Sequence, residues 1–230
     1  MKTIAIITAR GGSKRIPRKN IKEFCGKPII AYSIEAALNS GAFDTVMVST
    51  DDEEIADISK KFGAEVPFFR SGATSNDFAT TTDVLMEVLD EYGRRGCHFD
   101  SACCIYPTAP FVTGLRLKEA MDTLNESGAD SVIPVVDFSY PPQRAMVIEN
   151  VSLVFKNEEY LTTRSQDLEK QYHDAGQFYA FKTDSFKKNK NILKGNIKPL
   201  ILDDLEVQDI DTLVDWKLAE LKYKLINEEK

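Results

Sequence analysis

Residues 3–20 read Thr3-Ile4-Ala5-Ile6-Ile7-Thr8-Ala9-Arg10-Gly11-Gly12-Ser13-Lys14-Arg15-Ile16-Pro17-Arg18-Lys19-Asn20, and this stretch decides the fold. Its first six residues form a short, nearly continuous apolar run, which is typical of a buried β-strand. The next twelve residues form a loop that contains two glycines and several basic side chains. A buried strand that leads directly into such a loop predicts an α/β protein with an anion bound beyond the end of its first strand.

Downstream of this stretch, short apolar runs alternate with amphipathic ones. We predict helices over residues 28–40, 50–62, 80–92 and 113–126, and strands over residues 45–49, 64–69, 101–106 and 130–136. Thr50-Asp51-Asp52-Glu53 has the form of a capping box, with Thr50 at the N-cap. This alternation predicts a largely parallel sheet that helices cover on both sides.

The pattern changes after residue 136, where Ser139-Tyr140-Pro141-Pro142 interrupts it. Residues 145–148 and 152–155 are expected to form a hairpin, and residues 157–172 are polar and irregular. Strand-like runs return at 177–182 and 198–202. A last helix over residues 212–226 carries one apolar stripe, made by Val214, Leu218, Leu221 and Leu225. We therefore predict a core of residues 1–136 and 174–230, with residues 137–173 inserted into it as a lobe.

The charge of the chain is unevenly distributed. Its net charge is −7, which argues against nucleic acid or an anionic membrane as a partner. Residues 10–22 nevertheless hold six basic and no acidic side chains, so we expect a local anionic ligand. The first residues are too weakly apolar for a signal peptide, and no stretch approaches the ~20 apolar residues of a membrane span. The four cysteines show no metal or redox spacing, so we expect a cytoplasmic protein with reduced thiols.

The basic loop is the first motif that carries chemistry. Two glycines let backbone N–H groups converge on an anion, and the surrounding cations can neutralise a triphosphate. The loop is neither a P-loop nor the dinucleotide-binding GxGxxG motif. The alternative interpretation is a solvated basic loop without a ligand.

Two further motifs lie later in the chain. In Asp209-Ile210-Asp211, an extended backbone would project both carboxylates to one face, which suits Mg²⁺. The alternative is that Asp211 only caps the last helix. Tyr106-Pro107-Thr108-Ala109-Pro110-Phe111 follows a strand and predicts a rigid loop at the ligand-binding edge, although it could equally be a simple turn.

Together these motifs resemble those of the CMP-sialate synthetases, the acylneuraminate cytidylyltransferases. The family pattern A-R-x-x-S-K-x-x-x-x-K-N is matched by residues 9–20, P-T-S-P by residues 107–110, and I-D-I-D-T by residues 209–212. The family's Arg before a Ser/Asp/Thr-rich segment is matched by Arg70 and residues 75–81. The resemblance covers nearly the whole chain. It implies a Rossmann-like, mostly parallel sheet of the nucleotidyltransferase, or glycosyltransferase A-like, type. It also implies a homodimer in which the lobe provides dimerisation and covers the partner's sugar site.

The resemblance also implies roles for individual residues. The residues expected to bind CTP are Arg10, Gly11, Gly12, Ser13, Lys14, Lys19, Asn20, Arg70, Ala79 and Thr81. Within this set, Arg10, Ser13, Lys14 and Lys19 would hold the triphosphate. The cytosine and ribose would be contacted by Asn20, Arg70, Thr81 and the backbone of Ala79. Mg²⁺ would bind Asp209 and Asp211, and the catalytic residues would be Lys19, Arg10 and Asp211. The residues expected to contact an acidic nine-carbon sugar are Tyr106, Thr108, Phe111, Arg144, His173 and Gln177. Arg144 would act on the sugar of the other protomer, or would be an ordinary exposed arginine.

Departures from the sialate pattern fall where the sugar would lie. Sialate enzymes carry Gln at the position of Tyr106 and Leu-Arg at the position of Phe111-Val112. Residues 172–179, Tyr-His-Asp-Ala-Gly-Gln-Phe-Tyr, resemble the pseudaminic acid cytidylyltransferase branch. This implies Mg²⁺-dependent transfer of CMP from CTP to pseudaminic acid, by attack of the anomeric hydroxyl on the α-phosphorus. We expect Tyr106, Phe111, Val112 and Phe178 to form an apolar wall for the extra acylamino group. The alternatives are a CMP-N-acetylneuraminate or CMP-legionaminate synthetase, a glycosyltransferase that uses a nucleotide-sugar donor, and a non-catalytic CTP sensor.

Overall fold

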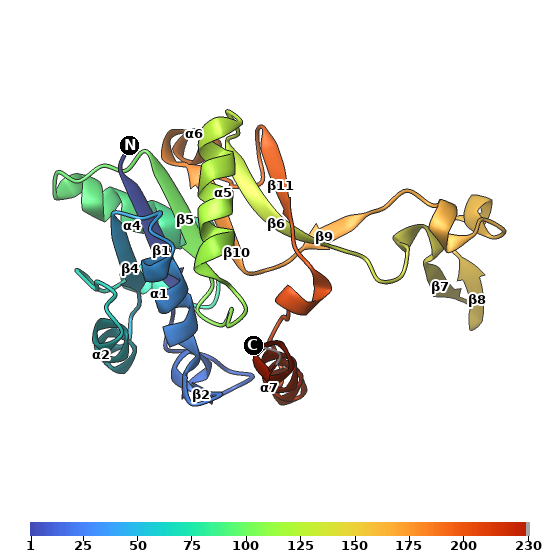
Figure 1. Ribbon diagram of the computed structural model, residues 1–230, viewed down its shortest axis with the longest axis horizontal. Coiled ribbons are helices and arrows are strands. Elements are labelled where there is room, and N and C mark those ends of the chain that lie inside the picture. The colour runs from blue at the N-terminus through green and yellow to red at the C-terminus, as the bar shows by residue number, and fades with distance from the viewer. Residues whose placement is uncertain (229–230) are drawn as a thin grey trace.

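The computed structural model describes residues 1–228 (Figure 1). Within them, seven strands form a central sheet, and five of these strands run in the same direction. The strand order is β11-β6-β10-β5-β1-β4, and β9 pairs with β6. The strands are β1 (Thr3–Thr8), β4 (Thr45–Ser49), β5 (Ser101–Ile105), β6 (Ser131–Asp137), β9 (Tyr172–Asp174), β10 (Phe178–Lys182) and β11 (Ile197–Ile201). Because β9 and β10 run antiparallel to their neighbours, the sheet is mixed but mostly parallel, as predicted.

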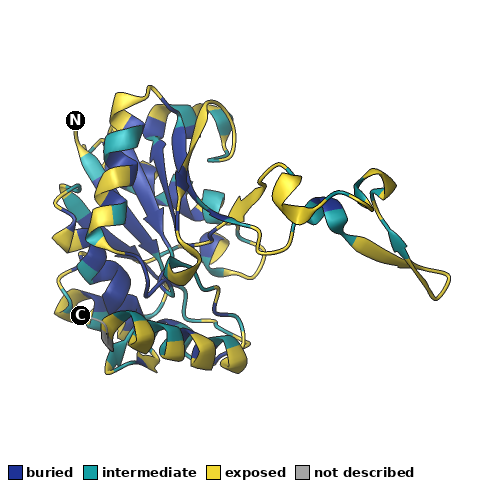
Figure 2. Cartoon of the chain, turned by 45° about the vertical axis from the view of Figure 1, so that its right-hand side comes forward, coloured by how far each residue is buried: buried dark blue, intermediate teal, exposed yellow. Residues whose placement is uncertain are grey.

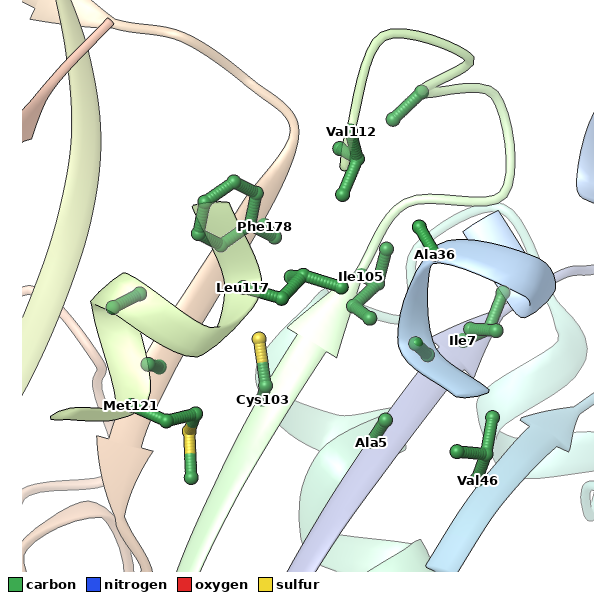
Figure 3. Packing of buried hydrophobic residues seen from close by; sticks show 14 of the residues in the cluster. Ala5, Ile7, Ala36, Val46, Cys103, Ile105, Val112, Leu117, Met121 and Phe178 are labelled. Carbon is green, nitrogen blue, oxygen red and sulfur yellow. The ribbon is translucent and has the colours of Figure 1, made fainter. Parts of the chain in front are cut away.

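Helices cover both faces of this sheet, as the alternating pattern predicted. Side chains of successive strand residues point to opposite faces. In β1, Ala5 and Ile7 face a core cluster with α1, α2 and α5, whereas Ile4 and Ile6 face a second cluster with α4 and α6. Figure 3 shows part of the first cluster, in which Leu117 of α5 lies between Phe178 and Ile105 of the sheet. The helices are α1 (Ile29–Asn39), α2 (Glu53–Lys61), α3 (Gly72–Ser75), α4 (Thr81–Arg94), α5 (Gly114–Glu126) and α6 (Thr183–Asn189).

A third cluster fixes the C-terminal helix α7 (Leu213–Glu228) beside the basic loop. Trp216 of α7 packs with Ile16 of the loop and with Phe24 of the short pair β2 (Glu23–Phe24) and β3 (Lys27–Pro28). The apolar stripe expected from the sequence, Val214, Leu218, Leu221 and Leu225, lies on the opposite, exposed side of α7. Packing of α7 therefore brings together two segments that are about 200 positions apart in the chain, as Ile16 and Trp216 are.

The segment between β6 and β9 leaves the core and projects to one side (Figure 1). It contains the expected hairpin, with strands β7 (Met146–Glu149) and β8 (Ser152–Phe155). In Figure 2 most of this segment is exposed, in contrast to the buried strands of the sheet. Ile148 and Leu153 of the hairpin are more than half exposed. No helix within residues 1–228 is long and apolar enough to cross a membrane.

Two local predictions were wrong. Residues 64–69 do not form a strand, because only Glu65 bridges to Met47, and Pro67 has no N–H with which to continue the ladder. The cap of α2 is Asp52 and not Thr50: the Asp52 carboxylate accepts the backbone N–H of Ile55 at 3.0 Å. Helix α6 was missed, because its seven residues are too few to show a clear helical period.

Candidate active site

The basic loop folds over the carboxyl end of β1 and is held against the start of α2. The N–H of Gly11 donates to a carboxylate oxygen of Asp51 at 2.8 Å. A Cβ atom on Gly11 would lie 2.7 Å from a carboxylate oxygen of Asp52, so any other residue here would displace the Asp52 side chain. A Cβ on Gly12 would meet nothing within 4 Å. The glycine positions are therefore distinct: Gly11 secures the loop to the protein, and its N–H is engaged in this structure.

A cavity of about 400 Å³ lies under this loop, at the carboxyl ends of β1 and β5. It brings together five residues predicted for the nucleotide, which are Arg10, Ser13, Lys14, Lys19 and Asn20. Its other lining residues are Thr8, Arg15, Tyr106, Pro107 and Thr108. We call it the cationic cavity, because four of its ten lining side chains are basic.

Carboxylates of the chain pair with the basic side chains of the cationic cavity. Asp77 contacts Arg10 at 3.0 Å and Lys14 at 2.5 Å. Asp211 lies 2.6 Å from Arg15 and 3.7 Å from Lys19. The hydrogen bond with Lys14, assisted by the charge of Arg10, holds the pKa of the Asp77 carboxyl below its ordinary value. An entering polyphosphate would compete with these carboxylates for the same cations.

Lys19 is the most buried cation of the cavity, with 18% of its side chain exposed. Its Nζ donates to the backbone carbonyl of Ile210 at 2.8 Å, which links the loop to the segment before α7. Burial lowers the pKa of the Lys19 ammonium, and the nearby Asp211 partly opposes this effect. Asn20 is also buried, and its amide donates to the carbonyl of Arg10 at 2.8 Å. In this structure Asn20 therefore shapes the loop, in addition to lining the cavity.

A second cavity of about 570 Å³ adjoins the first, because Tyr106 and Thr108 line both. It contains the predicted sugar residues His173 and Gln177. The side chain of Gln177 is buried, and its amide donates to the carbonyl of Glu206 at 2.5 Å. We call this space the adjoining cavity. The structure thus places four of the six predicted sugar residues around one space.

A smaller cavity of about 220 Å³ is also lined by Tyr106, together with Thr81. Sequence reasoning gave no role to Tyr179, Ile192 or Leu193, which line it as well. The Tyr179 hydroxyl donates to Asp174 at 2.7 Å, and its ring packs edge-on against that of Tyr106, 5.6 Å between centroids. No signal in the sequence marked residues 192 and 193, because they come from a loop after α6.

The expectation of an apolar wall for the sugar was wrong for three of its four residues. Phe178 is fully buried in the core between the sheet, α1 and α5, and Val112 belongs to the same cluster. Phe111 packs against Tyr223 of α7, 6.1 Å between ring centroids, and lines neither the cationic nor the adjoining cavity. Strand alternation explains the error at Phe178, since its neighbour Tyr179 is the residue that faces Tyr106.

Other predicted residues lie outside these three cavities. Arg70 is largely buried and donates to Ser49 through Nε at 2.8 Å and Nη2 at 2.9 Å; burial lowers its pKa to about 10. The N–H of Ala79 donates to the side-chain oxygen of Asn76 at 3.0 Å. Arg144 lies in the projecting segment, and its Nη1 donates to the Ser165 hydroxyl at 3.2 Å. The structure therefore does not bring these three residues to the cavities at which the other predicted residues meet.

The acidic pair lies between the two larger cavities. Ile210 is buried in the third core cluster, whereas Asp209 lines the adjoining cavity and Asp211 faces Arg15 and Lys19 of the cationic cavity. Asp211 does not cap α7. Thr212 and Asp215 instead exchange hydrogen bonds, in which the N–H of Thr212 donates to Asp215 at 2.7 Å and the N–H of Asp215 donates to the Thr212 hydroxyl at 3.3 Å. The capping alternative for Asp211 is therefore excluded.

This donor set fits Mg²⁺ only if a substrate supplies the remaining ligands. Within residues 1–228, no three His, Cys, Asp or Glu side chains come together in a way that could hold a metal. Two carboxylates beside a phosphate-sized cationic cavity nevertheless match the way Mg²⁺ binds, through one or two carboxylates, phosphate oxygens and water. A cationic cavity, an adjoining cavity and an acidic pair at the carboxyl edge of an α/β sheet define a nucleotidyltransferase.

Comparisons with known proteins give the family. The sequence profile described as "Cytidylyltransferase" matches residues 4–209, and the chain belongs to this family. It is 42% identical over 229 residues to the pseudaminic acid cytidylyltransferase of Campylobacter jejuni, with 99% of each chain covered. It is 34% identical to the CMP-N,N'-diacetyllegionaminic acid synthase of Legionella pneumophila, over 100% of this chain and 99% of the relative.

Solved structures agree on the fold. The CMP:2-keto-3-deoxy-manno-octonic acid synthetase, solved in complex with CTP, has a TM-score of 0.72 at 18% identity; 99% of this chain and 100% of that chain are covered. A 4-diphosphocytidyl-2C-methyl-D-erythritol synthase from Anaerococcus prevotii has a TM-score of 0.64 at 16% identity, with 97% and 98% covered. At these identities the likeness concerns the fold alone, and it supports the predicted nucleotidyltransferase type.

Proposed function

We propose that this protein transfers CMP from CTP to pseudaminic acid, or to a close 5,7-diacylamino nonulosonic acid, and releases pyrophosphate. The observation that carries the proposal is the meeting of the cationic and adjoining cavities at Tyr106 and Thr108. The first suits a triphosphate, and the second has room for a nine-carbon sugar. Full-length identity of 42% to enzymes named for pseudaminic acid supports this choice of sugar.

On the nucleotide side, positioning and charge neutralisation are sufficient for the chemistry. Arg10, Lys14, Arg15 and Lys19 surround the cavity in which the triphosphate would bind. The sugar hydroxyl would attack the α-phosphorus in line with the departing pyrophosphate, so no covalent enzyme intermediate is needed. Lys19 is placed to bind most strongly as phosphate charge develops, because it is the least exposed of the cations that pair with Asp211.

Asp209 and Asp211 are the residues that would hold Mg²⁺. The ion supplies charge neutralisation for the phosphates and lowers the pKa of a bound hydroxyl. Binding of phosphate by Arg15 and Lys19 would free Asp211 from its ion pairs for this role. Asp209 lies on the side of the adjoining cavity, toward the incoming sugar.

On the sugar side, polar and apolar surfaces are divided between two cavities. His173 and Gln177 line the adjoining cavity, in which the sugar carboxylate and ring would lie. Tyr106, Tyr179 and Leu193 line the smaller cavity, whose partly apolar surface suits an acylamino group or a methyl group. Thr81, Thr82, Asp174 and Asn191 also line this cavity, so a buried hydroxyl of N-acetylneuraminate would cost ~1–3 kcal/mol only where it reaches none of these side chains.

We also propose that the protein is a homodimer in which residues 137–173 form the lobe that reaches a second copy. The hairpin of this lobe exposes Ile148, Val151 and Leu153, and in Figure 2 the lobe stands clear of its own core. A single copy leaves this apolar surface in water, which favours burial against another protein surface. Arg144 of a second copy would then join His173 at the sugar carboxylate.

Mixing two inactive variants tests whether a site is shared. Lys19→Ala and Arg144→Ala each damage one component of the site. If these components come from different copies, co-refolded mixtures contain heterodimers with one intact site. Random pairing then restores about a quarter of the wild-type activity. Activity that stays at the level of the two separate variants, or a protein that light scattering shows to be monomeric at assay concentration, would refute the shared site.

The activity itself is tested by pyrophosphate release with each of the four nucleoside triphosphates and three sugars. We expect turnover with CTP and Mg²⁺, and a kcat/KM for pseudaminic acid that is roughly a hundredfold or more above that for N-acetylneuraminate. Legionaminic acid is the third sugar, because a legionaminate synthase is 34% identical. A value for N-acetylneuraminate equal to or above that for pseudaminic acid would overturn the sugar assignment. An equal value for legionaminic acid would extend the specificity to the 5,7-diacylamino class as a whole. Lack of turnover with every sugar would overturn the proposed transfer.

A further inference from the structure

The side chain of Arg18 points away from the cationic cavity, unlike those of Arg10, Lys14, Arg15 and Lys19. It does not line the cationic cavity and instead contacts the first turn of α2. Its guanidinium forms two hydrogen bonds with the Asp52 carboxylate, one of them 2.9 Å from Nη2, and a further one with Glu54. This pairing raises the pKa of Arg18 and lowers that of Asp52. The cation is therefore committed to the protein itself.

The side-chain pairing of Arg18 matters for the loop because the backbone turns sharply at this residue. Arg18 has φ 55° and ψ 30°, a left-handed conformation that L-residues adopt only when their surroundings impose it. Its carbonyl accepts the N–H groups of Ile21 and Lys22, each at 3.0 Å, and so begins the short 3₁₀ turn at Lys19–Ile21. The direction in which the next residue, Lys19, leaves the loop depends on this turn.

The same turn of α2 holds the other end of the loop. Asp51 accepts the N–H of Gly11 at 2.8 Å, and Asp52 fills the space beside the Gly11 Cα. Asp52 also accepts the N–H of Ile55 and so is fixed in place by the helix that it caps. Both ends of the segment that encloses the cationic cavity are thereby attached to one rigid helix terminus.

We propose that Arg18 and Asp52 are positioning residues for nucleotidyl transfer: their ion pair fixes the left-handed turn at Arg18 against α2 and so aims Lys19 into the cationic cavity. Arg18 on this view does not contact the nucleotide. The inference rests on the proposed function in that it takes Lys19 as a ligand of the triphosphate. It adds that two residues outside the cavity determine how well Lys19 acts.

The test compares steady-state kinetics of Arg18→Met, Asp52→Asn and the double variant. Met keeps an unbranched apolar side chain, and Asn remains a good N-cap for α2. We expect each single variant to lower kcat roughly ten- to hundredfold, because misplacement of a catalytic cation by about 1 Å costs this much. KM for CTP should change by less than about threefold. The double variant should be no worse than either single one, because both remove the same contact.

A direct role of Arg18 in phosphate binding predicts different changes in KM for CTP. If Arg18 were a phosphate ligand that Asp52 masks, Asp52→Asn would free it and lower KM for CTP, whereas Arg18→Met would raise KM. That result would overturn the proposal, as would a near wild-type kcat in either single variant or losses that add in the double variant. Arg18→Lys should recover part of kcat, because a lysine can still pair with Asp52. Asp57→Asn, an exposed acid on the same helix, serves as the matched control and should match the wild type.

A fluorescence measurement keeps this test independent of turnover. Trp216 is the single tryptophan of the chain, and it packs with Ile16 of the loop, while the ammonium of Lys22 lies 5.4 Å from its ring centroid. Release of the loop should increase quenching of Trp216 by acrylamide in both single variants and not in Asp57→Asn. If the wild type transfers no CMP but the quenching increases, the proposed function fails and the loop attachment stands. Unchanged quenching together with an unchanged kcat in an active enzyme overturns the positioning role alone.

Discussion

Replacement of Lys19 by alanine should nearly abolish turnover while the fold survives. The change removes an ammonium that lies 2.8 Å from the Ile210 carbonyl and 3.7 Å from Asp211. A positioned donor that strengthens its hold on developing charge contributes about 3–4 kcal/mol in water-poor sites, or roughly 10²–10³ in kcat. Because the change removes one hydrogen bond and one ion pair but no member of the three apolar clusters, the melting temperature should shift by only a few degrees.

The pH dependence of the activity provides a second, independent test of the role of Lys19. Burial places the pKa of Lys19 below 10.5 in the free protein. The charged form is the one present below that lowered pKa, and it is lost as the pH rises through it. Since kcat/KM for CTP reports ionisations of the free enzyme, it should fall at alkaline pH before an ordinary lysine would titrate. Lys19→Arg keeps its charge throughout, so its alkaline limb should move to higher pH or disappear.

The assay is continuous pyrophosphate release at saturating sugar, over a series of pH values, with circular dichroism to verify folding. Lys60→Ala, an exposed lysine on α2, is the control for loss of a positive charge. Near-normal kcat in Lys19→Ala would remove this side chain from the mechanism. An alkaline limb that is the same in the wild type and Lys19→Arg would assign that ionisation to a different group.

Four further substitutions probe the rest of the site and the core beside it. Asp209→Asn and Asp211→Asn should each raise the Mg²⁺ concentration needed for half-maximal rate by at least about tenfold, with melting unchanged, and full activity of both at low Mg²⁺ would refute the metal assignment. Asp77→Asn removes the carboxylate that pairs with two cations of the cationic cavity, so KM for CTP should fall roughly two- to fivefold, most clearly at low salt. A KM that rises instead would make Asp77 part of the binding site. Phe178→Ala should lower the free energy of unfolding by about 3–5 kcal/mol in denaturant titrations, and a change in sugar preference without this loss would contradict its placement in the core.

The sequence predicts those elements of the fold in which local pattern and tertiary environment agree. Strand β1 is apolar on both faces because both faces are covered, and α4 shows its buried stripe because only one side meets the sheet. The pattern failed at residues 64–69, where apolar composition suggested a strand but Pro67 stops the ladder after one bridge. In α7 the clearest apolar stripe lies in solvent, while Trp216 and Ala219 on the other side are buried. Periodicity identifies a helix, and the packing partner decides which side is covered.

For the site, the sequence predicts where the charges lie but not with what each of them pairs. Six basic residues in thirteen indicate an anion, yet the structure divides them among different tasks. Arg10 and Lys14 face the cavity and pair with Asp77, whereas Lys19 reaches the segment before α7. Arg18, equally basic and adjacent to Lys19, turns away to α2.

These differences follow from contacts that no local pattern contains. The partner of Lys19, the Ile210 carbonyl, is 191 positions away in the chain. The partners of Arg18, Asp52 and Glu54, lie 34 and 36 positions away at the start of α2. Adjacent side chains on a left-handed turn point in different directions, so residue type alone cannot distinguish a ligand of the phosphate from a residue that holds the loop. What can be predicted from the sequence is the number of charges available to an anion. Their assignment depends on the third core cluster and on the acidic turn of α2, because these two contacts set the path of the loop between Gly11 and Lys19.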